Sequence, residues 1–103
     1  MPISAVKTIN TSWTLKKIAA VKKRFEKDVV FIDHRFGSDW TGDPGMFFRI
    51  VVTDAVAKDD DRLLDVTVRV SRDLIDTLQV SESEWIPYFN YWSVSERKKD
   101  KRF

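Results

Sequence analysis

The chain has 103 residues, of which 43% are hydrophobic and 33% charged, and it contains no cysteine. A chain of this length suits one domain, because two separate cores would leave each half near the lower limit of stable folding. Without cysteine it has no disulfide framework, no thiol nucleophile and no cysteine zinc site. No apolar run approaches the roughly 20 residues that span a bilayer, and no signal-peptide pattern opens the chain, so we expect a cytoplasmic protein.

The net charge of +2 at pH 7 conceals an uneven distribution. Residues 1–27 contain seven basic residues and one acid, and residues 97–103 contain five basic residues and one acid. The stretch between them, 28–96, contains fourteen acids and six basic residues. Because an acidic body repels phosphate, this pattern confines any binding of nucleic acid to the two basic ends.

The first half of the chain predicts a helix followed by two strands. Ser12 can cap a helix over 13–27, where Leu15, Ile18 and Val21 recur at helical spacing and lysines fill the other face. Two segments rich in β-branched and aromatic residues that partly alternate, Val29–Phe36 and Met46–Thr53, predict strands. All three glycines lie between them, so residues 37–45 form the main loop.

The second half is less uniform. Residues 54–61 are expected to form an acidic turn. The segment 62–80 fits two interpretations, because alternating valines favour a strand, whereas its apolar residues also follow helical spacing. Opposite charges four residues apart stabilise a helix by about 0.2–0.5 kcal/mol per pair, and no turn signal interrupts the segment, so a single helix is preferred. Pro87 then precedes a third strand near Tyr88–Val94.

These elements predict an α+β fold in the order α-β-β-α-β, a small sandwich with a three-stranded sheet and two helices on one face. Residues 1–96 form the single domain of this prediction. The charged segment 97–103 is expected to be a flexible basic tail.

The glycine-rich loop is the most specific motif. Phe36-Gly37-Ser38-Asp39-Trp40-Thr41-Gly42-Asp43 follows a helix and an apolar strand. In that position it resembles the Phe-Gly-Ser-x-x-x-Gly-Asp loop of minimal nucleotidyltransferase domains, relatives of DNA polymerase beta. The resemblance implies phosphate contacts at Gly37 and Ser38, because glycines allow the backbone to approach an anion closely. The alternative is an ordinary turn between two strands, with Trp40 covering the core.

The same resemblance implies a pair of metal-binding carboxylates at the start of the next strand, separated by one residue. Here Phe47 and Arg49 occupy those places, and an arginine repels Mg²⁺ rather than binding it. We therefore predict a protein that is not an enzyme and has no catalytic residue, metal site or cofactor.

A second resemblance starts at Met46. The run Met-Phe-Phe-Arg-Ile-Val-Val-Thr-Asp, followed by an interruption, an amphipathic helix and a final strand, looks like the BolA family, which has the type-II KH fold. The helix here reads Val68-Arg69-Val70, without the histidine of that family, and the Gly-x-x-Gly signature of KH domains is missing. The missing histidine puts the family's partnering through a metal cluster in doubt.

Two polar features have structural explanations. His34 is the only histidine, and without a nucleophile and acid at suitable spacing it is expected to be packed or hydrogen-bonded within the sheet. The run Asp59-Asp60-Asp61 lacks the pattern of a calcium loop, and it is expected to form a solvated turn and the N-cap of the following helix.

Five aromatic residues, Trp85, Tyr88, Phe89, Tyr91 and Trp92, fall within eight positions. On a strand they divide between two faces, so some face the core and others face solvent or a partner. Tyrosine and tryptophan are preferred anchors of protein interfaces, and they also stack on the bases of single-stranded nucleic acid. We predict that a partner protein, or a second copy of the chain, binds through Trp40, Trp85, Tyr88, Tyr91 and Trp92.

The alternative function is nucleic-acid binding by the basic ends. The residues expected to contact phosphate belong to the first helix and the tail, namely Lys16, Lys23, Arg24, Lys98 and Lys99. If the tail folds back beside the helix, these residues would form one binding patch, whereas a solvated helix face is the simpler interpretation. The sequence therefore favours a small interaction protein that binds another protein or forms a homodimer.

Overall fold

The computed structural model describes residues 11–99 and has the predicted α-β-β-α-β order. Further short helices flank the second main helix and the last strand. In chain order the elements are α2 (Thr11–Arg24), β1 (Val29–Ser38), β2 (Pro44–Val52), α3 (Asp54–Lys58), α4 (Asp60–Thr77), the 3-10 turn η1 (Val80–Glu82), β3 (Ile86–Ser93) and α5 (Val94–Lys99).

The three strands form one mixed sheet in the order β1-β2-β3. β1 and β2 are antiparallel, as expected for neighbours joined by a short loop, and their register shifts at a bulge between Val29 and Phe31. β2 and β3 are parallel, which requires a crossover, and α3 and α4 provide it. β2 is therefore the central strand, and β1 and β3 are the two edges.

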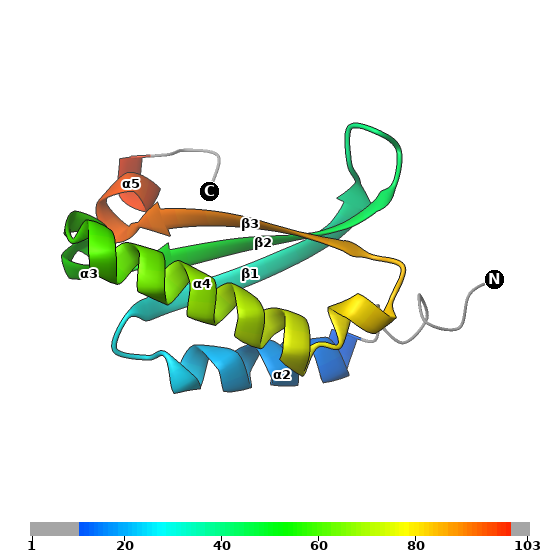
Figure 1. Ribbon diagram of the computed structural model, residues 1–103, viewed down its shortest axis with the longest axis horizontal. Coiled ribbons are helices and arrows are strands. Elements are labelled where there is room, and N and C mark those ends of the chain that lie inside the picture. The colour runs from blue at the N-terminus through cyan, green and yellow to red at the C-terminus, as the bar shows by residue number, and fades with distance from the viewer. Residues whose placement is uncertain (1–10, 100–103) are drawn as a thin grey trace.

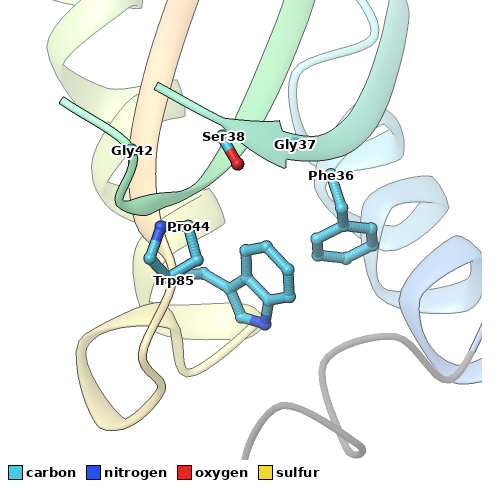
Figure 2. A pocket seen from close by; sticks show the side chains of 6 residues that line it. All are labelled: Phe36, Gly37, Ser38, Gly42, Pro44 and Trp85. Atoms are coloured by element: carbon cyan, nitrogen blue, oxygen red, sulfur yellow. The ribbon is translucent and has the colours of Figure 1, made fainter. Parts of the chain in front are cut away.

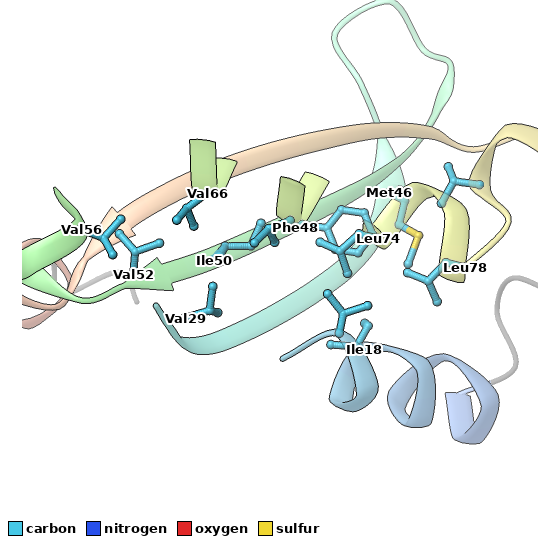
Figure 3. Close-up of a cluster of buried hydrophobic side chains, with 13 residues drawn as sticks. Ile18, Val29, Met46, Phe48, Ile50, Val52, Val56, Val66, Leu74 and Leu78 are labelled. Carbon is cyan, nitrogen blue, oxygen red and sulfur yellow. The ribbon is translucent and has the colours of Figure 1, made fainter. Parts of the chain in front are cut away.

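Both long helices, α2 and α4, cover the same face of the sheet, and the core lies between (Figure 1; Figure 3). Alternate residues of β2 from Met46 to Val52 point into this core, as the alternating pattern predicts. The buried apolar cluster consists of Ile18, Val21, Val29, Met46, Phe48, Ile50, Val52, Val56, Val66, Val70, Leu74, Leu78 and Val80. We call this side of the sheet the inner face and the opposite side the outer face.

Helix α2 buries a narrower stripe than the sequence indicates. Thr14, Ile18 and Val21 are buried at a spacing of four and three residues, whereas Leu15 is 52% exposed. The helix ends at Arg24 rather than at residue 27, and the amides of Phe25, Glu26 and Asp28 close turns onto preceding carbonyls. The chain then enters β1.

The acidic turn expected at 54–61 is wrong, because Asp54–Lys58 forms helix α3. Thr53 caps this helix by accepting a hydrogen bond from the amide of Val56, whose side chain is buried in the core. Asp59 then caps α4 by accepting a hydrogen bond from the amide of Arg62. The preference for a helix after residue 62 is confirmed, since α4 runs unbroken from Asp60 to Thr77.

No helix within residues 11–99 is long and apolar enough to cross a membrane.

The third strand is confirmed with shifted ends. It begins at Ile86 and ends at Ser93, where Ser93 and Glu96 bond reciprocally and start α5. The helix α5 reaches Lys99, so the first three residues of the expected tail are helical. Residues 100–103 of that tail lie outside the described part of the chain.

Candidate interaction surface

The aromatic side chains of β3 divide between the two faces of the sheet. In the parallel pairing with β2, Phe89 and Tyr91 lie beside Phe48 and Ile50, whose side chains are in the core. Tyr88 and Trp92 lie beside Phe47 and Val51 and therefore point to the outer face. Of the predicted partner-binding set, Tyr88 and Trp92 thus share the face that α2 and α4 leave uncovered.

Trp85 and Tyr91 pack on the core side. The ring of Trp85 lies 4.8 Å from that of Phe36, centroid to centroid. The Tyr91 hydroxyl donates to the carbonyl of Thr67 at 3.0 Å and is 2.6 Å from the Ser71 hydroxyl. Burial raises the pKa of Tyr91 to about 12, although the hydrogen bond with Ser71 opposes that shift. Both aromatic residues hold β3 against the rest of the chain.

A row of aromatic rings crosses the outer face near the loop between β1 and β2. Phe47 and Tyr88 stack at 5.1 Å with nearly parallel planes, and Trp40 meets Tyr88 edge-on at 5.7 Å. The guanidinium of Arg35 lies 4.5 Å from the centre of the Phe47 ring, a cation–π arrangement. We call Phe47, Tyr88 and Trp40 the aromatic row.

The loop that carries Trp40, residues 39–43, is organised by one carboxylate. Oδ1 of Asp39 accepts hydrogen bonds from the amides of Thr41 and Asp43, each at 2.9 Å, and from the Thr41 hydroxyl at 2.6 Å. Oδ2 of Asp39 accepts one from the Tyr88 hydroxyl at 2.7 Å. The amide of Asp39 donates to the carbonyl of Asp43, and Gly42 adopts a positive φ of 89° that closes the turn.

These bonds fix the charge of Asp39 and the position of Trp40. The hydrogen bonds from Thr41 and then Tyr88 lower the pKa of Asp39 to about 2, so its carboxylate is ionised at neutral pH. Trp40 nevertheless remains 84% exposed, and its ring meets that of Tyr88 edge-on. The Trp40 ring therefore stands on a hydrogen-bonded loop and does not cover the core, as the alternative interpretation of the loop had it.

The other end of the outer face is covered by α5. The Arg97 guanidinium lies 4.2 Å from the centre of the Phe31 ring, and Val51 beside it is fully buried. Between the two ends, Arg49 forms an ion pair with Asp33 on the neighbouring strand. Burial raises the pKa of Asp33, but hydrogen bonds from Arg49 and from the His34 amide outweigh that effect and leave the pKa below its usual value.

The residues of the phosphate-binding interpretation lie at the end of β1. Gly37 and Ser38 pair with Gly45 and Pro44 in the ladder, so they belong to a strand rather than to a free loop. Together with Phe36, Gly42, Pro44 and Trp85 they border an open hollow of about 320 Å³ (Figure 2). Within residues 11–99, no three histidine or acidic side chains are grouped closely enough to hold a metal ion.

His34 lies on the inner face of β1, opposite Phe48, and its ring meets Phe36 edge-on at 5.6 Å. Burial lowers its pKa, although the neighbouring charge of Asp33 opposes the shift. This contact with an aromatic ring agrees with the expectation that His34 is packed within the sheet.

The basic residues of the nucleic-acid hypothesis are divided between the two sides of the sheet. Lys16, Lys23 and Arg24 belong to α2 on the inner face, whereas Lys98 and Lys99 belong to α5, which packs beside Phe31 at the outer face. Arg24 is engaged by α4: it binds both carboxylate oxygens of Asp73, at 2.7 and 2.9 Å, and Thr77. Within the described residues, the tail does not fold back beside α2.

Three residues that build the aromatic surface around Trp40 were not predicted from the sequence. They are Phe47, Arg35 and Asp39, whose carboxylate organises the loop. Phe47 and Arg35 are opposite each other in the antiparallel ladder, a pairing that depends on register. The spacing Asp39-Trp40-Thr41-Gly42-Asp43 contained the signal for the loop, since an aspartate two residues before a threonine commonly bonds its backbone amide.

In comparisons with protein-family models, curated proteins and solved structures, nothing matches this chain.

Proposed function

We propose that this chain is a non-enzymatic interaction protein that binds another protein through the outer face of its sheet, with Trp40 as the anchor. The observation that carries the proposal is the large exposed indole of Trp40 on a loop fixed by hydrogen bonds. The partner has an apolar pocket that receives this ring. Tyr88 and Phe47 supply the flat surface beside it.

The exposed indole supports this function because its exposure has an energetic cost in water. A buried tryptophan contributes strongly to a protein core or to the centre of an interface. In the single chain Trp40 is part of neither a core nor an interface, although its loop has a defined conformation. A loop already ordered before binding loses little conformational entropy when a partner covers it.

The charges around Trp40 favour a protein partner over nucleic acid. Asp39, held ionised, and the exposed Asp43 flank the indole and would repel phosphates. Opposite charges on a partner would complement them, so its pocket is expected to carry a lysine or arginine at the rim. Arg24, one of the residues proposed to contact phosphate, is already paired with Asp73.

We propose a non-enzymatic role because an aromatic and a basic residue stand at the two positions where the nucleotidyltransferase resemblance requires carboxylates. Phe47 is stacked on Tyr88, and Arg49 is paired with Asp33. The BolA and type-II KH resemblance supplies no binding loop either. In KH domains a glycine-containing signature lies between two helices, whereas α3 and α4 are joined here by Lys58-Asp59-Asp60, which is acidic and contains no glycine.

The test compares the immobilised full-length chain with Trp40→Ala and with Leu15→Ala as the matched control. Leu15 is also an exposed apolar side chain, but it lies on α2, on the other side of the molecule. Proteins retained by wild type and Leu15→Ala and lost with Trp40→Ala are identified, purified and titrated by calorimetry. We expect Trp40→Ala to weaken binding at least about 30-fold, the effect of losing roughly 2 kcal/mol.

The proposal fails if Trp40→Ala retains the same proteins with the same affinity as wild type. It also fails if the chain binds single-stranded RNA or DNA at about 50 mM salt with an affinity that falls steeply as salt is added, and Trp40→Ala removes that binding. In that case the aromatic row would be a platform for bases.

A further inference from the structure

The two edges of the sheet differ in how well they are protected from pairing with another strand. β1 carries a bulge at Val29/Phe31 and the charged residues Asp33 and Arg35. β3 has no charged residue between Ile86 and Ser93 and no bulge in its pairing with β2. Bulges and charges are the usual means of blocking strand addition. Pro87, the second residue of β3, is the only residue of this strand without a backbone N–H donor. The segment Tyr88–Ser93 can therefore pair with a further strand.

The flank of α4 next to this edge is apolar and exposed. Tyr91 of β3 bonds to Thr67 and Ser71, so these two residues mark the side of α4 that lies toward β3. Leu64 and Val68 lie on the same flank by helical spacing, and they are 65% and 44% exposed. An open hollow of about 390 Å³ follows this flank, lined by Thr67, Val68, Ser71, Arg72 and Ile75.

We propose that a second copy of this chain occupies this surface: β3 pairs antiparallel with β3 of the second copy, and the α4 flank packs against its own counterpart. A two-fold axis perpendicular to the sheet relates the copies and keeps both helical layers on one side. Strands about 4.8 Å apart bring helices that lie near the edge to within the roughly 8–10 Å at which helices pack. This site is separate from the surface anchored by Trp40.

The charges of α4 favour a second copy rather than an unrelated strand. Its solvent-facing side carries Asp61 and Asp65 in the first half, Asp65 being paired with Arg69 of the same helix at 3.4 Å, and it carries Arg72 and Asp76 in the second half. Two antiparallel copies that cross at Val68 place Arg72 of each copy at the level of Leu64 of the other, between Asp61 and Asp65. The surface is therefore complementary to itself in charge as well as in its apolar stripe.

The test is the mass of the full chain by sedimentation velocity and light scattering from about 1 to about 100 µM. We expect a concentration-dependent dimer whose dissociation constant rises at least about tenfold in Val68→Asp. Leu15→Asp, which places the same charge on an exposed apolar site of α2, should leave the constant unchanged. Arg72→Asp and Asp65→Arg should each weaken the dimer, and the double variant should recover part of the loss. Circular dichroism checks that each variant is folded.

A monomer throughout this concentration range overturns the proposal, and so does a dimer that Val68→Asp does not weaken. Because the chain has no cysteine, single cysteines locate the contact independently. A short bismaleimide should link two copies through Asn90→Cys on β3 and not through Val30→Cys on β1. Linkage only through Val30→Cys would place the second copy at the β1 edge and would contradict the proposal. Loss of the dimer leaves the Trp40 surface intact, so this proposal and the proposed function can fail separately.

Discussion

The hydroxyl of Tyr88 donates a hydrogen bond of 2.7 Å to Oδ2 of Asp39, and it thereby joins the last strand to the loop between the first two. The same tyrosine ring supports Trp40 edge-on and stacks on Phe47. One side chain thus fixes the loop and provides the surface beneath the exposed indole. The conformation of the proposed anchor therefore depends on contacts between segments 49 residues apart in sequence.

The pKa of Asp39 reports on the integrity of this loop. We expect an NMR titration of its carboxyl to give about 2 in the wild type, a higher value in Tyr88→Phe, and a still higher value in Thr41→Val, because the Thr41 bond has the larger effect. Since the folded pKa lies below the ordinary value of about 3.9, the loop's contribution to stability is present above that pH and is lost as the pH falls toward 2. An Asp39 that titrates normally in the wild type would contradict the hydrogen-bonded loop.

Arg24 is expected to stabilise the fold by joining α2 to α4. Arg24→Ala removes a two-point ion pair with Asp73 and a bond to Thr77. Because the guanidinium is about half exposed, we expect a loss of only about 1 kcal/mol in the free energy of unfolding, measured in urea. Lys23→Ala, next to it on the same helix, should change that free energy by less than about 0.5 kcal/mol. Equal effects of the two variants would argue against the ion pair.

The Tyr91 hydroxyl is expected to make the protein sensitive to high pH. Both tyrosines have raised pKa values, and that of Tyr91 reaches about 12, so ultraviolet titration should show ionisation above the ordinary value of 10.0. A raised pKa favours the neutral form in the folded state, so this contribution to stability is complete below pH 10 and is lost as the pH rises through 12. Tyr91→Phe should remove that dependence and cost about 1–2 kcal/mol, because Ser71 and the Thr67 carbonyl lose a partner.

Gly45 is expected to tolerate substitution less well than Gly37, its partner in the ladder. A methyl group on Gly45 would lie 2.8 Å from the Phe47 ring and 3.3 Å from that of Tyr88, so Gly45→Ala must displace the stacked pair. We expect a loss of about 1–3 kcal/mol and an altered near-ultraviolet circular dichroism signal. Gly37→Ala meets mainly the far end of the flexible Arg35 side chain at 3.1 Å and should cost clearly less. Similar losses for both glycines would contradict this packing.

The order of elements was predictable because each long element has its own periodic pattern, but their connections depend on contacts between distant residues. The opposite charges that stand four residues apart in α4 illustrate this difference. Asp65 and Arg69 do pair along the helix at 3.4 Å, whereas Asp73 binds Arg24 of α2 instead of Arg69. Helix α3 was missed because five residues are too few for a periodic pattern, and its stability comes from the Thr53 cap and the burial of Val56.

The candidate site was predictable only in part for a similar reason. Strand alternation separates Tyr88 and Trp92 from Tyr91, but it does not say which face the helices cover. That depends on the parallel alignment of β3 with β2, which places Tyr91 against Ser71 and leaves Tyr88 on the outer face. The exposure of Trp40 could not be deduced either, because a tryptophan in a glycine-rich loop is equally compatible with a folded-back ring.

The bulge at Val29/Phe31 has a consequence for how large an assembly of this chain can become. Strand addition at one unprotected edge joins two copies and then leaves only β1 edges at both ends of the shared sheet. A sheet with two unprotected edges could add copies without limit, as fibres do. If two copies pair through β3 as proposed, the distorted and charged β1 edges would end growth after that single step, so the bulge would limit the assembly to two copies.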